Sequence, residues 1–498
     1  MPTDPWTPIE THALQSLEQL FAAGPDRLAT LSREVAGIYF DWSKTHLDDG
    51  LVSAFADLAQ ARGFAAARDA LFAGDIVNVT ERRAAEHVAE RGSGNPEAVQ
   101  AAAARRARMR GLVDAVEAGA FGEIDAVLHI GIGGSVLGPE VVVDSLGRDG
   151  ARMDIRFLSN IDPQAFEDSV DGLDPVSTLV VAASKTFTTA ETMANLESAL
   201  AWLREGGVDD AYGRVVAVTA SPDAALAAGV DESRILTFSE GVGGRYSLWS
   251  AVSVSAALAL GWDRFEELLE GAAEMDRHFR YADGRENVVL TAAFADLLYT
   301  QKLGSQTRAV FPYDERLRLL VPFLQQLEME SNGKSVTAEG QPLGRPSGPV
   351  VWGGTGTDAQ HAVFQLLHQG TALIPVEFVA VAESDGAVPD QHRQLLLNAF
   401  AQGAALMRGK ASDDPHRSYA GNRPSATILL DRLDARTLGA LLAFYEHRTF
   451  TNAVLLGINP FDQFGVELGK QIAGQLASGA DEDSFDPSTL ALIEKAGL

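Results

Sequence analysis

The alternation of short β-prone runs with helical segments, beginning near residue 126, constrains the fold more than any other feature of the sequence. Strands that alternate with helices are joined by right-handed crossovers, which place them in a parallel sheet covered on both faces. Helical segments such as 189–203 and 248–260 separate most of the runs. The sequence therefore predicts an α/β fold. Its first block contains five expected strands, at residues 126–130, 154–158, 177–183, 214–221 and 235–238.

A second block of the same kind follows a helical spacer near residues 262–303. Before residue 126 the pattern is mostly helical and predicts no strand, and a final helix is expected to begin near Pro460. Two successive α/β blocks predict two related sandwiches. In the second block, the expected strands are 318–323, 350–352, 374–381 and 427–430, and the expected helices are 360–369, 390–407 and 438–450.

Composition excludes several classes of function. The 498 residues are long enough for two or three domains, and 46% hydrophobic with 22% charged residues is an ordinary globular balance. A net charge of −28 makes a nucleic-acid partner unfavourable, so an anionic metabolite needs a locally positive pocket. The sequence contains no cysteine, which excludes disulfides, thiolate chemistry and cysteine-ligated metals.

Targeting features are also missing from the pattern. The start, Met1 to Trp6, lacks a basic region followed by an apolar core, so no secretory signal is expected. No apolar run approaches the roughly 20 residues that cross a bilayer. We therefore expect a cytoplasmic protein that uses no membrane.

A glycine-rich loop follows the first expected strand, at His129-Ile-Gly-Ile-Gly-Gly-Ser135. Such a loop exposes backbone N–H groups at a helix N-terminus, where phosphate binds. The dinucleotide fingerprint fails because Val136 stands where its last glycine belongs, and no Gly-Lys-Ser/Thr is present for a P-loop. A tight strand-to-helix turn without a ligand explains this loop equally well when it is considered alone.

A second loop, Ser184-Lys-Thr-Phe-Thr-Thr189, follows the expected strand 177–183 and opens a helix. Four hydroxyls and one ammonium at a strand C-terminus suit a phosphomonoester. Helix N-capping is the alternative, but it needs only one or two of these side chains. Ligands of open α/β sheets lie at the carboxyl ends of strands, where both loops are expected, so phosphate binding is favoured.

The candidate base is Glu330, within Met329-Glu-Ser-Asn-Gly-Lys334. It is expected in a polar, glycine-containing turn after the apolar run 319–324, and a partly desolvated carboxylate beside hydrogen-bond donors can move a proton on carbon. Arg245 follows paired glycines in a turn that leads into a helix, and it offers a planar donor for a developing oxyanion. Helix capping or a surface ion pair is the alternative for this arginine.

Two segments carry a resemblance to a known family. Residues 243–250 (Gly-Gly-Arg-Tyr-Ser-Leu-Trp-Ser) and 457–470 (Gly-Ile-Asn-Pro-Phe-Asp-Gln-Phe-Gly-Val-Glu-Leu-Gly-Lys) resemble the two signatures of the phosphoglucose isomerase family. Further matches follow in family order over most of the chain. They are residues 40–44 and 78–84, the loops ending at Ser135 and Thr189, and the segments 329–334 and 356–371.

The resemblance implies a role for each matched residue. Glu330 would pass a proton between C1 and C2 of the sugar, and Arg245 would stabilise the cis-enediolate. His361 and Lys470 would open the ring and handle the ring-oxygen and hydroxyl protons. The residues implied to hold the phosphate are Ser135, Ser184, Lys185, Thr186 and Thr189, and the other implied substrate contacts are Gly134, Gly244, Gln326 and Gln463.

The resemblance also implies the architecture and the assembly. It implies two α-β-α sandwich domains of the sugar-isomerase (SIS) type with parallel sheets, and a reversible aldose–ketose isomerisation in glycolysis and gluconeogenesis. It implies a homodimer in which the histidine reaches the site from the partner subunit, and no cofactor or metal. The expected boundaries are 1–105 for a helical N-terminal extension, 106–275 and 276–470 for the two sandwiches, and 471–498 for a C-terminal helical tail.

Three departures from the family pattern and two rival functions accompany this prediction. A non-catalytic sugar-phosphate-binding regulator would lose the reacting groups, which are present here, and an amide-transferring relative would need a cysteine. His361 and His368 lie seven residues apart, but without a patterned carboxylate they are poor metal ligands. The departures are Val136 for aspartate, Ser253 for glycine, and Asp358-Ala359 for Asn-Gly.

Overall fold

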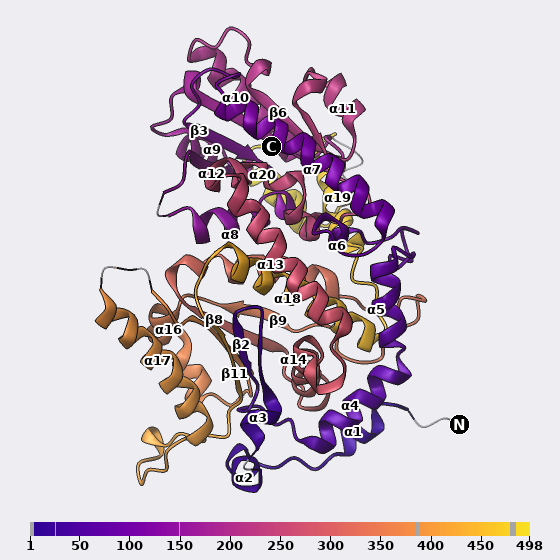
Figure 1. Cartoon of the computed structure of the whole chain (residues 1–498), viewed down its shortest axis with the longest axis vertical. Helices are drawn as coiled ribbons and strands as arrows, with labels where there is room; N and C mark the ends of the chain where they lie inside the picture. Colours follow the sequence, from indigo (N-terminus) through magenta and orange to yellow (C-terminus); the bar gives the residue numbers. More distant parts are fainter. Residues whose placement is uncertain (1–3, 25, 149, 385, 387, 479–484) are drawn as a thin grey trace. The chain divides into compact units, whose positions relative to one another are not determined.

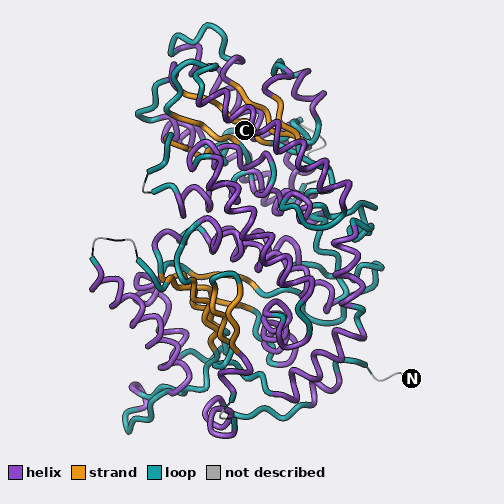
Figure 2. Tube along the Cα trace, viewed as in Figure 1, coloured by secondary structure: helices purple, strands orange, loops and turns teal. Residues whose placement is uncertain are grey.

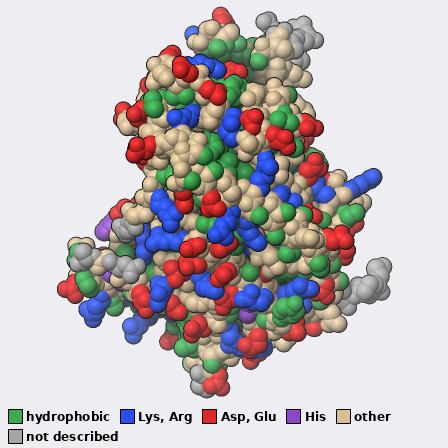
Figure 3. Space-filling model, turned by 45° about the horizontal axis from the view of Figure 1, so that its top comes forward, with side chains coloured by type: hydrophobic (Ala, Val, Ile, Leu, Met, Phe, Trp, Pro, Cys, Tyr) green, Lys and Arg blue, Asp and Glu red, His purple; other side chains and the backbone are tan. Residues whose placement is uncertain are grey.

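The computed structural model describes residues 4–24, 26–148, 150–384, 386, 388–478 and 485–498. The chain divides into two compact units, one ending at Pro460 and one beginning at Phe461. The first unit contains both sheets of the described chain (Figures 1 and 2). No described helix is long and apolar enough to cross a membrane. The face in Figure 3 carries acidic and basic side chains together.

The first sheet is entirely parallel, in the order β4-β3-β5-β6-β7, and its strands match the five that the sequence predicts. Every residue of β3, β5 and β6 is buried, which explains why these strands are continuous apolar runs. Leu196, Leu200 and Leu203 pack with this sheet in one apolar core. The strands are β3 (Ala126–Ile130), β4 (Asp154–Leu158), β5 (Thr178–Ala183), β6 (Val215–Thr219) and β7 (Ile235–Thr237).

The second sheet is mixed, in the order β1-β2-β11-β10-β8-β9. Strands β11, β10, β8 and β9 are parallel, whereas β2 lies antiparallel to β11 with Phe40 opposite Ile428. Phe311, Phe364 and Phe378 lie in the apolar core on one face. The strands are β1 (Ser32–Val35), β2 (Ile38–Asp41), β8 (Thr307–Tyr313), β9 (Val350–Gly353), β10 (Val376–Val381) and β11 (Ser425–Leu430).

The hairpin β1–β2 contradicts the prediction that no strand precedes residue 126. Ala36 and Gly37 both have positive φ, as a two-residue hairpin turn requires. Alanine is an unusual residue at such a position, and each strand has only four residues. The pairing depends on β11, which lies far along the chain, so the local pattern carries little of the signal.

The expected strand at 318–323 is wrong as well. This stretch is helical and belongs mostly to α15 (Leu320–Leu324), while the strand is β8 (Thr307–Tyr313), just before it. A short apolar run without alternation fits a buried helix as well as a buried strand, and periodicity does not separate the two. The predicted strands at 350–352, 374–381 and 427–430 are confirmed as β9, β10 and β11.

Helices cover both faces of the second sheet, with α16 and α17 on one side and α14 and α18 on the other (Figure 1). Helix α18 is buried along almost its whole length. It packs closely on α13, because a Cβ on Gly271 would lie 1.8 Å from the Arg436 carbonyl oxygen and one on Gly439 2.0 Å from that of Leu268. These helices are α13 (Trp262–Tyr281), α14 (Val288–Leu297), α16 (Gly356–Gln369), α17 (Pro389–Arg408) and α18 (Ala435–Leu456).

The remaining helices connect the strands or precede them. In the first unit they are α1 (Thr7–Thr11), α2 (Leu17–Ala23), α3 (Arg27–Leu31), α4 (Asp49–Ala61), α5 (Phe64–Ala73), α6 (His87–Glu90), α7 (Pro96–Glu117), α8 (Leu137–Leu146), α9 (Pro163–Val170), α10 (Ala190–Glu205), α11 (Pro222–Ala227) and α12 (Val254–Leu260). The second unit contains α19 (Glu467–Ala477) and α20 (Pro487–Ala496).

Candidate active site

Two loops meet at the carboxyl edge of the first sheet. The glycine-rich loop follows β3 and forms the short helix η1 (Gly133–Ser135), and the Ser184–Thr189 loop follows β5. Strands β3 and β5 are parallel neighbours, so both loops leave the same edge of the sheet. This is the edge where open α/β sheets bind ligands.

The Ser184–Thr189 loop presents its hydroxyls without using them as helix caps. Thr189 stands at the N-cap of α10, but its side chain makes no capping hydrogen bond and lies instead 3.0 Å from the Ser184 Oγ. The Phe187 N–H donates to the same Ser184 oxygen at 3.1 Å. Phe187 has a φ of 54°, and its ring is buried. The capping alternative therefore does not account for these hydroxyls, and Thr186 remains exposed.

Lys185 from the same loop points its ammonium at a different segment. Its Nζ donates to the carbonyl oxygens of Glu240 at 2.7 Å and Val242 at 3.1 Å, just before the turn that carries Arg245. Burial lowers the pKa of this lysine. In this structure Lys185 thus connects the Ser184–Thr189 loop to the turn that precedes Arg245. The phosphate contact expected for Lys185 stays a prediction.

Gly133 and Gly134 let the glycine-rich loop lie close to Gln326 and to the helix that carries Arg245. A Cβ on Gly134 would lie 2.1 Å from the carbonyl carbon of Gly244, so only glycine fits there. Gly133 has a φ of 56°, and the Gln326 amide nitrogen would lie 2.7 Å from a Cβ on it. The structure thus brings together three predicted substrate contacts, Gly134, Gly244 and Gln326.

Arg245 lies on the short helix η5 (Gly244–Trp249), with its side chain only 2% exposed. Its Nε donates to the Ser331 hydroxyl at 2.6 Å, and one terminal nitrogen donates to the Pro460 carbonyl. The other terminal nitrogen, Nη1, lies 3.5 Å from the Glu330 Oε1. A guanidinium held on two sides in this way directs its third side at the candidate base.

Glu330 is the last residue of the π-helix η10 (Gln325–Glu330), and the helix continues through Asn332. The expected polar turn at this carboxylate is therefore wrong, because the turn begins only after the helix ends. Single π turns inside α-helices recur at functional sites. The Glu330 side chain is 21% exposed, and the Lys334 ammonium donates to its backbone carbonyl at 2.8 Å.

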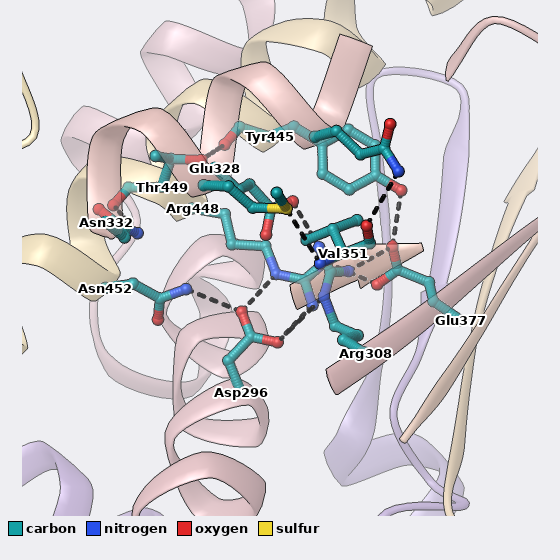
Figure 4. A network of polar contacts seen from close by, with 12 residues as sticks. Asp296, Arg308, Glu328, Asn332, Val351, Glu377, Tyr445, Arg448, Thr449 and Asn452 are labelled. Carbon is teal, nitrogen blue, oxygen red and sulfur yellow. Dashed lines mark hydrogen bonds and ion pairs between the residues drawn. The ribbon is translucent and has the colours of Figure 1, made fainter. Parts of the chain in front are cut away.

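A buried network of ion pairs and hydrogen bonds anchors the same π-helix (Figure 4). Glu328 pairs with Arg308 from β8, and the Asn332 amide donates to the Thr449 carbonyl at 3.1 Å. Arg308 also reaches Glu377 of β10 at 3.0 Å, and Arg448 of α18 bonds the same carboxylate at 2.6 Å. The backbone on both sides of Glu330 is thus fixed to the second sheet and to α18.

Four more predicted residues are His361, Gln463, Lys470 and Ser135. His361 is exposed on α16 and, within the described ranges, makes no hydrogen bond or ion pair, whereas its neighbour Gln360 accepts a 2.7 Å bond from Tyr313. Gln463 and Lys470 belong to the second unit, and Lys470 lies on α19. Ser135 of η1 is half-buried. The roles of all four remain predictions.

Comparison with known proteins identifies the family. The phosphoglucose isomerase family model matches residues 41–493. Glucose-6-phosphate isomerase of Rhizorhabdus wittichii is 61% identical over 492 residues, covering 99% of this chain and 98% of that protein. The crystal structure of a glucose-6-phosphate isomerase from Chlamydia trachomatis matches with a TM-score of 0.90 at 31% identity, covering 100% of this chain and 99% of that one. The chain belongs to the phosphoglucose isomerase family.

Two of the departures from the family pattern are accommodated within the first unit. Ser253, where the family has glycine, is fully buried, and its hydroxyl donates to the Leu248 carbonyl at 2.5 Å. Val136, where the family has aspartate, is buried directly after the glycine-rich loop. Neither residue leaves an unpaired polar atom at the site.

Motif analysis of a phosphoglucose isomerase sequence does not single out Ser331 or His129. Ser331 bonds to Arg245, which lies far away in sequence, so no local spacing indicates the contact. His129 lies on β3 with Nε2 2.8 Å from the Ser135 carbonyl and Nδ1 2.7 Å from the Ser255 hydroxyl. Burial lowers its pKa to about 4, so the ring is neutral and fixes the glycine-rich loop. Its position at the start of the segment that contains the loop is the only sequence signal for this role.

Proposed function

We propose that this chain catalyses the reversible isomerisation of D-glucose 6-phosphate and D-fructose 6-phosphate, a step of glycolysis and gluconeogenesis. Membership of the phosphoglucose isomerase family supports the reaction. The observation that carries the mechanism is the buried Arg245 held 3.5 Å from the Glu330 carboxylate, beside loops suited to phosphate.

In the proposed mechanism Glu330 removes the C2 proton of open-chain glucose 6-phosphate. The electron pair of that bond forms the C1–C2 double bond of a cis-enediolate, and the C1 oxygen takes up negative charge. Arg245 stabilises that charge. Glu330 then returns the proton to C1, while the C2 hydroxyl proton passes to the C1 oxygen and the C2 oxygen becomes the carbonyl. No net electron transfer occurs, so the chemistry requires no redox cofactor.

The other predicted residues complete the proposal. The phosphate is held by Ser135, Ser184, Lys185, Thr186 and Thr189, so that binding energy from the unreactive end positions the reacting end. Gly134, Gly244, Gln326 and Gln463 contact the sugar. His361 and Lys470 open the ring. The exposure of His361 is compatible with its reaching a second subunit, as a homodimer with shared sites requires. The protein works in the cytoplasm and uses no nucleic acid partner.

The domain boundaries belong to the same proposal. Two SIS-type sandwiches span residues 106–275 and 276–470, with an N-terminal extension before them and a C-terminal tail from 471. The hairpin β1–β2, which extends the second sheet, supports an extension that is structurally part of the second sandwich.

The decisive experiment follows deuterium. Purified protein is incubated with fructose 6-phosphate in D2O, and NMR follows the product and the label at C2. We expect glucose 6-phosphate with partial deuterium at C2, and a loss of kcat of about 10²-fold or more for Glu330→Gln. Glu339→Gln, which changes an exposed glutamate nearby, is the matched control. A chain that binds the sugar phosphate without isomerising it would be a regulator instead.

Shared sites are tested with mixed subunits. Glu330→Gln and His361→Ala chains carrying different tags are co-expressed, and heterodimers are isolated. If each site combines groups from two subunits, one of the two sites in a heterodimer is intact and activity returns. Heterodimers as inactive as the parent variants would refute the shared site.

A further inference from the structure

The Ser331 hydroxyl joins the two reacting groups of the site. Ser331 directly follows Glu330 and is fully buried. Its Oγ accepts the hydrogen bond from the Arg245 Nε at 2.6 Å and lies 3.0 Å from the Tyr246 hydroxyl. One side chain thus connects the helix of the base to the helix of the arginine.

These bonds fix the orientation of the guanidinium. Its Nε is directed at Ser331 and one terminal nitrogen at the Pro460 carbonyl, which leaves Nη1 on the side of Glu330. The separation of 3.5 Å between Nη1 and Oε1 exceeds the 2.7–2.9 Å typical of a charge-assisted hydrogen bond. The planar group cannot turn to form a two-bonded pair with the carboxylate unless it gives up its bond to Ser331.

The position of Ser331 is itself fixed. Glu328 on one side pairs with Arg308, and Asn332 on the other donates to the Thr449 carbonyl (Figure 4). The helix segment between these anchors carries both Glu330 and Ser331. The Ser331 oxygen therefore holds Arg245 in a fixed place relative to the base.

We propose that Ser331 is a positioning residue that keeps the Arg245–Glu330 pair open, and this inference rests on the proposed function. A closed pair would occupy the carboxylate lone pairs that must take the C2 proton and the N–H groups that must meet the enediolate oxygen. An open pair leaves the Glu330 carboxylate available to the substrate. Without the hydroxyl, the Arg245 Nε loses the acceptor that holds the guanidinium in this orientation relative to Glu330.

The test separates kcat from binding. In Ser331→Ala, kcat for fructose 6-phosphate is expected to fall about tenfold or more, the size of one hydrogen bond to a charged group. KM is expected to stay within about threefold, because the phosphate loops are untouched. The Kd of D-glucitol 6-phosphate, which has no carbonyl and cannot enolise, is measured by calorimetry and is expected to change equally little. These two readouts distinguish positioning from a general loosening of the site.

Two further variants complete the design. Ser253→Ala removes an equally buried hydroxyl, bonded to the Leu248 carbonyl, and is expected to keep wild-type kcat. Ser331→Cys fills the serine's space with a much weaker acceptor, so its kcat is expected between those of wild type and alanine. If the alanine variant does not fold, the kcat of the cysteine variant still tests the inference.

Some outcomes overturn the inference. Wild-type kcat in both Ser331 variants would do so, and so would a loss of kcat accompanied by an equal weakening of D-glucitol 6-phosphate binding. A wild-type protein that does not isomerise fructose 6-phosphate would refute the proposed function instead. The two failures are therefore distinguishable.

Discussion

Two arginine–carboxylate groups border the same π-helix and differ in how completely they are paired. In the first, Arg448 bonds Asp296 and Glu377 at 2.6 Å each, and all three side chains are almost fully buried. In the second, Arg245 is equally buried, but its carboxylate Glu330 is partly exposed and 3.5 Å away. Both carboxylates of the first group are bonded by Arg448 at 2.6 Å, whereas the carboxylate of the second group lies 3.5 Å from its arginine.

The difference shows what each group can do. Burial disfavours the charged form of Glu377, but Arg448 and Arg308 outweigh that effect and lower its pKa, so this carboxylate stays ionised. A buried charge needs this degree of pairing, because a lone one is costly. The Arg245–Glu330 pair can remain open because Ser331 and Pro460 satisfy the arginine from its other sides. The structural carboxylates are thus tightly bonded to arginine, whereas the proposed catalytic carboxylate is held 3.5 Å from its arginine.

The largest effect is expected from breaking the closed network. Arg448→Met leaves Asp296 and Glu377 without a main partner, and the free energy of unfolding is expected to fall by about 3–5 kcal/mol. Urea denaturation measures it. The control is Arg318→Met, because Arg318 bonds Asp144 at 2.8 Å on the surface and such pairs contribute less than about 1 kcal/mol. Equal losses in the two variants would remove the distinction between buried and exposed pairs.

His129 is a buried titratable group that bonds no carboxylate, so it extends the comparison between the two arginine–carboxylate groups. His129 bonds a carbonyl and a hydroxyl, and burial lowers its pKa from 6.5 to about 4. As the pH falls, the unfolded chain therefore takes up a proton at this histidine before the folded chain does. The stabilisation associated with neutral His129 is fully present above pH 6.5 and is lost as the pH falls toward 4. The loss is about 3 kcal/mol.

Denaturation of wild type and His129→Gln between pH 7 and 4 tests this. The difference in unfolding free energy between them is expected to shrink as the pH falls, because glutamine does not titrate. Other buried groups titrate identically in both proteins and cancel. A difference that is constant over this range would show that His129 is not held neutral.

Much of the fold follows from local patterns, and the exceptions depend on long-range contacts. Strands β5 and β6 are apolar runs that end at a hydroxyl residue, Ser184 directly after β5 and Thr219 at the end of β6, so their position is visible in the sequence. The hairpin β1–β2 pairs through β2 with β11, which lies far along the chain, and local patterns do not indicate such a contact. The apolar run before Glu330 has no alternation, and its helical state is decided by tertiary packing.

The candidate site divides in the same way. The types of residue needed for isomerisation stand in short motifs, so Glu330, Arg245 and the Ser184–Thr189 loop are identifiable from residues alone. Their mutual geometry is not, because Ser331 meets Arg245 through contacts between distant segments. Lys185 illustrates the limit, since its motif suggests phosphate while its ammonium bonds two carbonyls of the arginine turn.

The open pair itself is tested by a substitution that keeps the charge. Arg245→Lys retains a cation but loses the planar fork, so one ammonium cannot bond Ser331, the Pro460 carbonyl and the enediolate oxygen together. We expect kcat to fall about 10²-fold, the size of one lost donor to a developing oxyanion. The control is Arg318→Lys on the surface, measured in the same assay. A lysine variant with near wild-type kcat would show that charge alone suffices.

The smallest effect is expected where the site touches the part of the substrate that does not react. Thr189→Val keeps the side-chain shape and removes one hydroxyl, which lies 3.0 Å from the Ser184 Oγ. A lost hydrogen bond to a phosphate oxygen is expected to raise KM about tenfold and to leave kcat nearly unchanged. Thr188→Val is the matched control, because that hydroxyl is exposed and donates to Thr186 within the loop. A fall in kcat rather than a rise in KM would mean that Thr189 acts on the reacting end, and the separation between static and reactive groups would then extend into the phosphate loop.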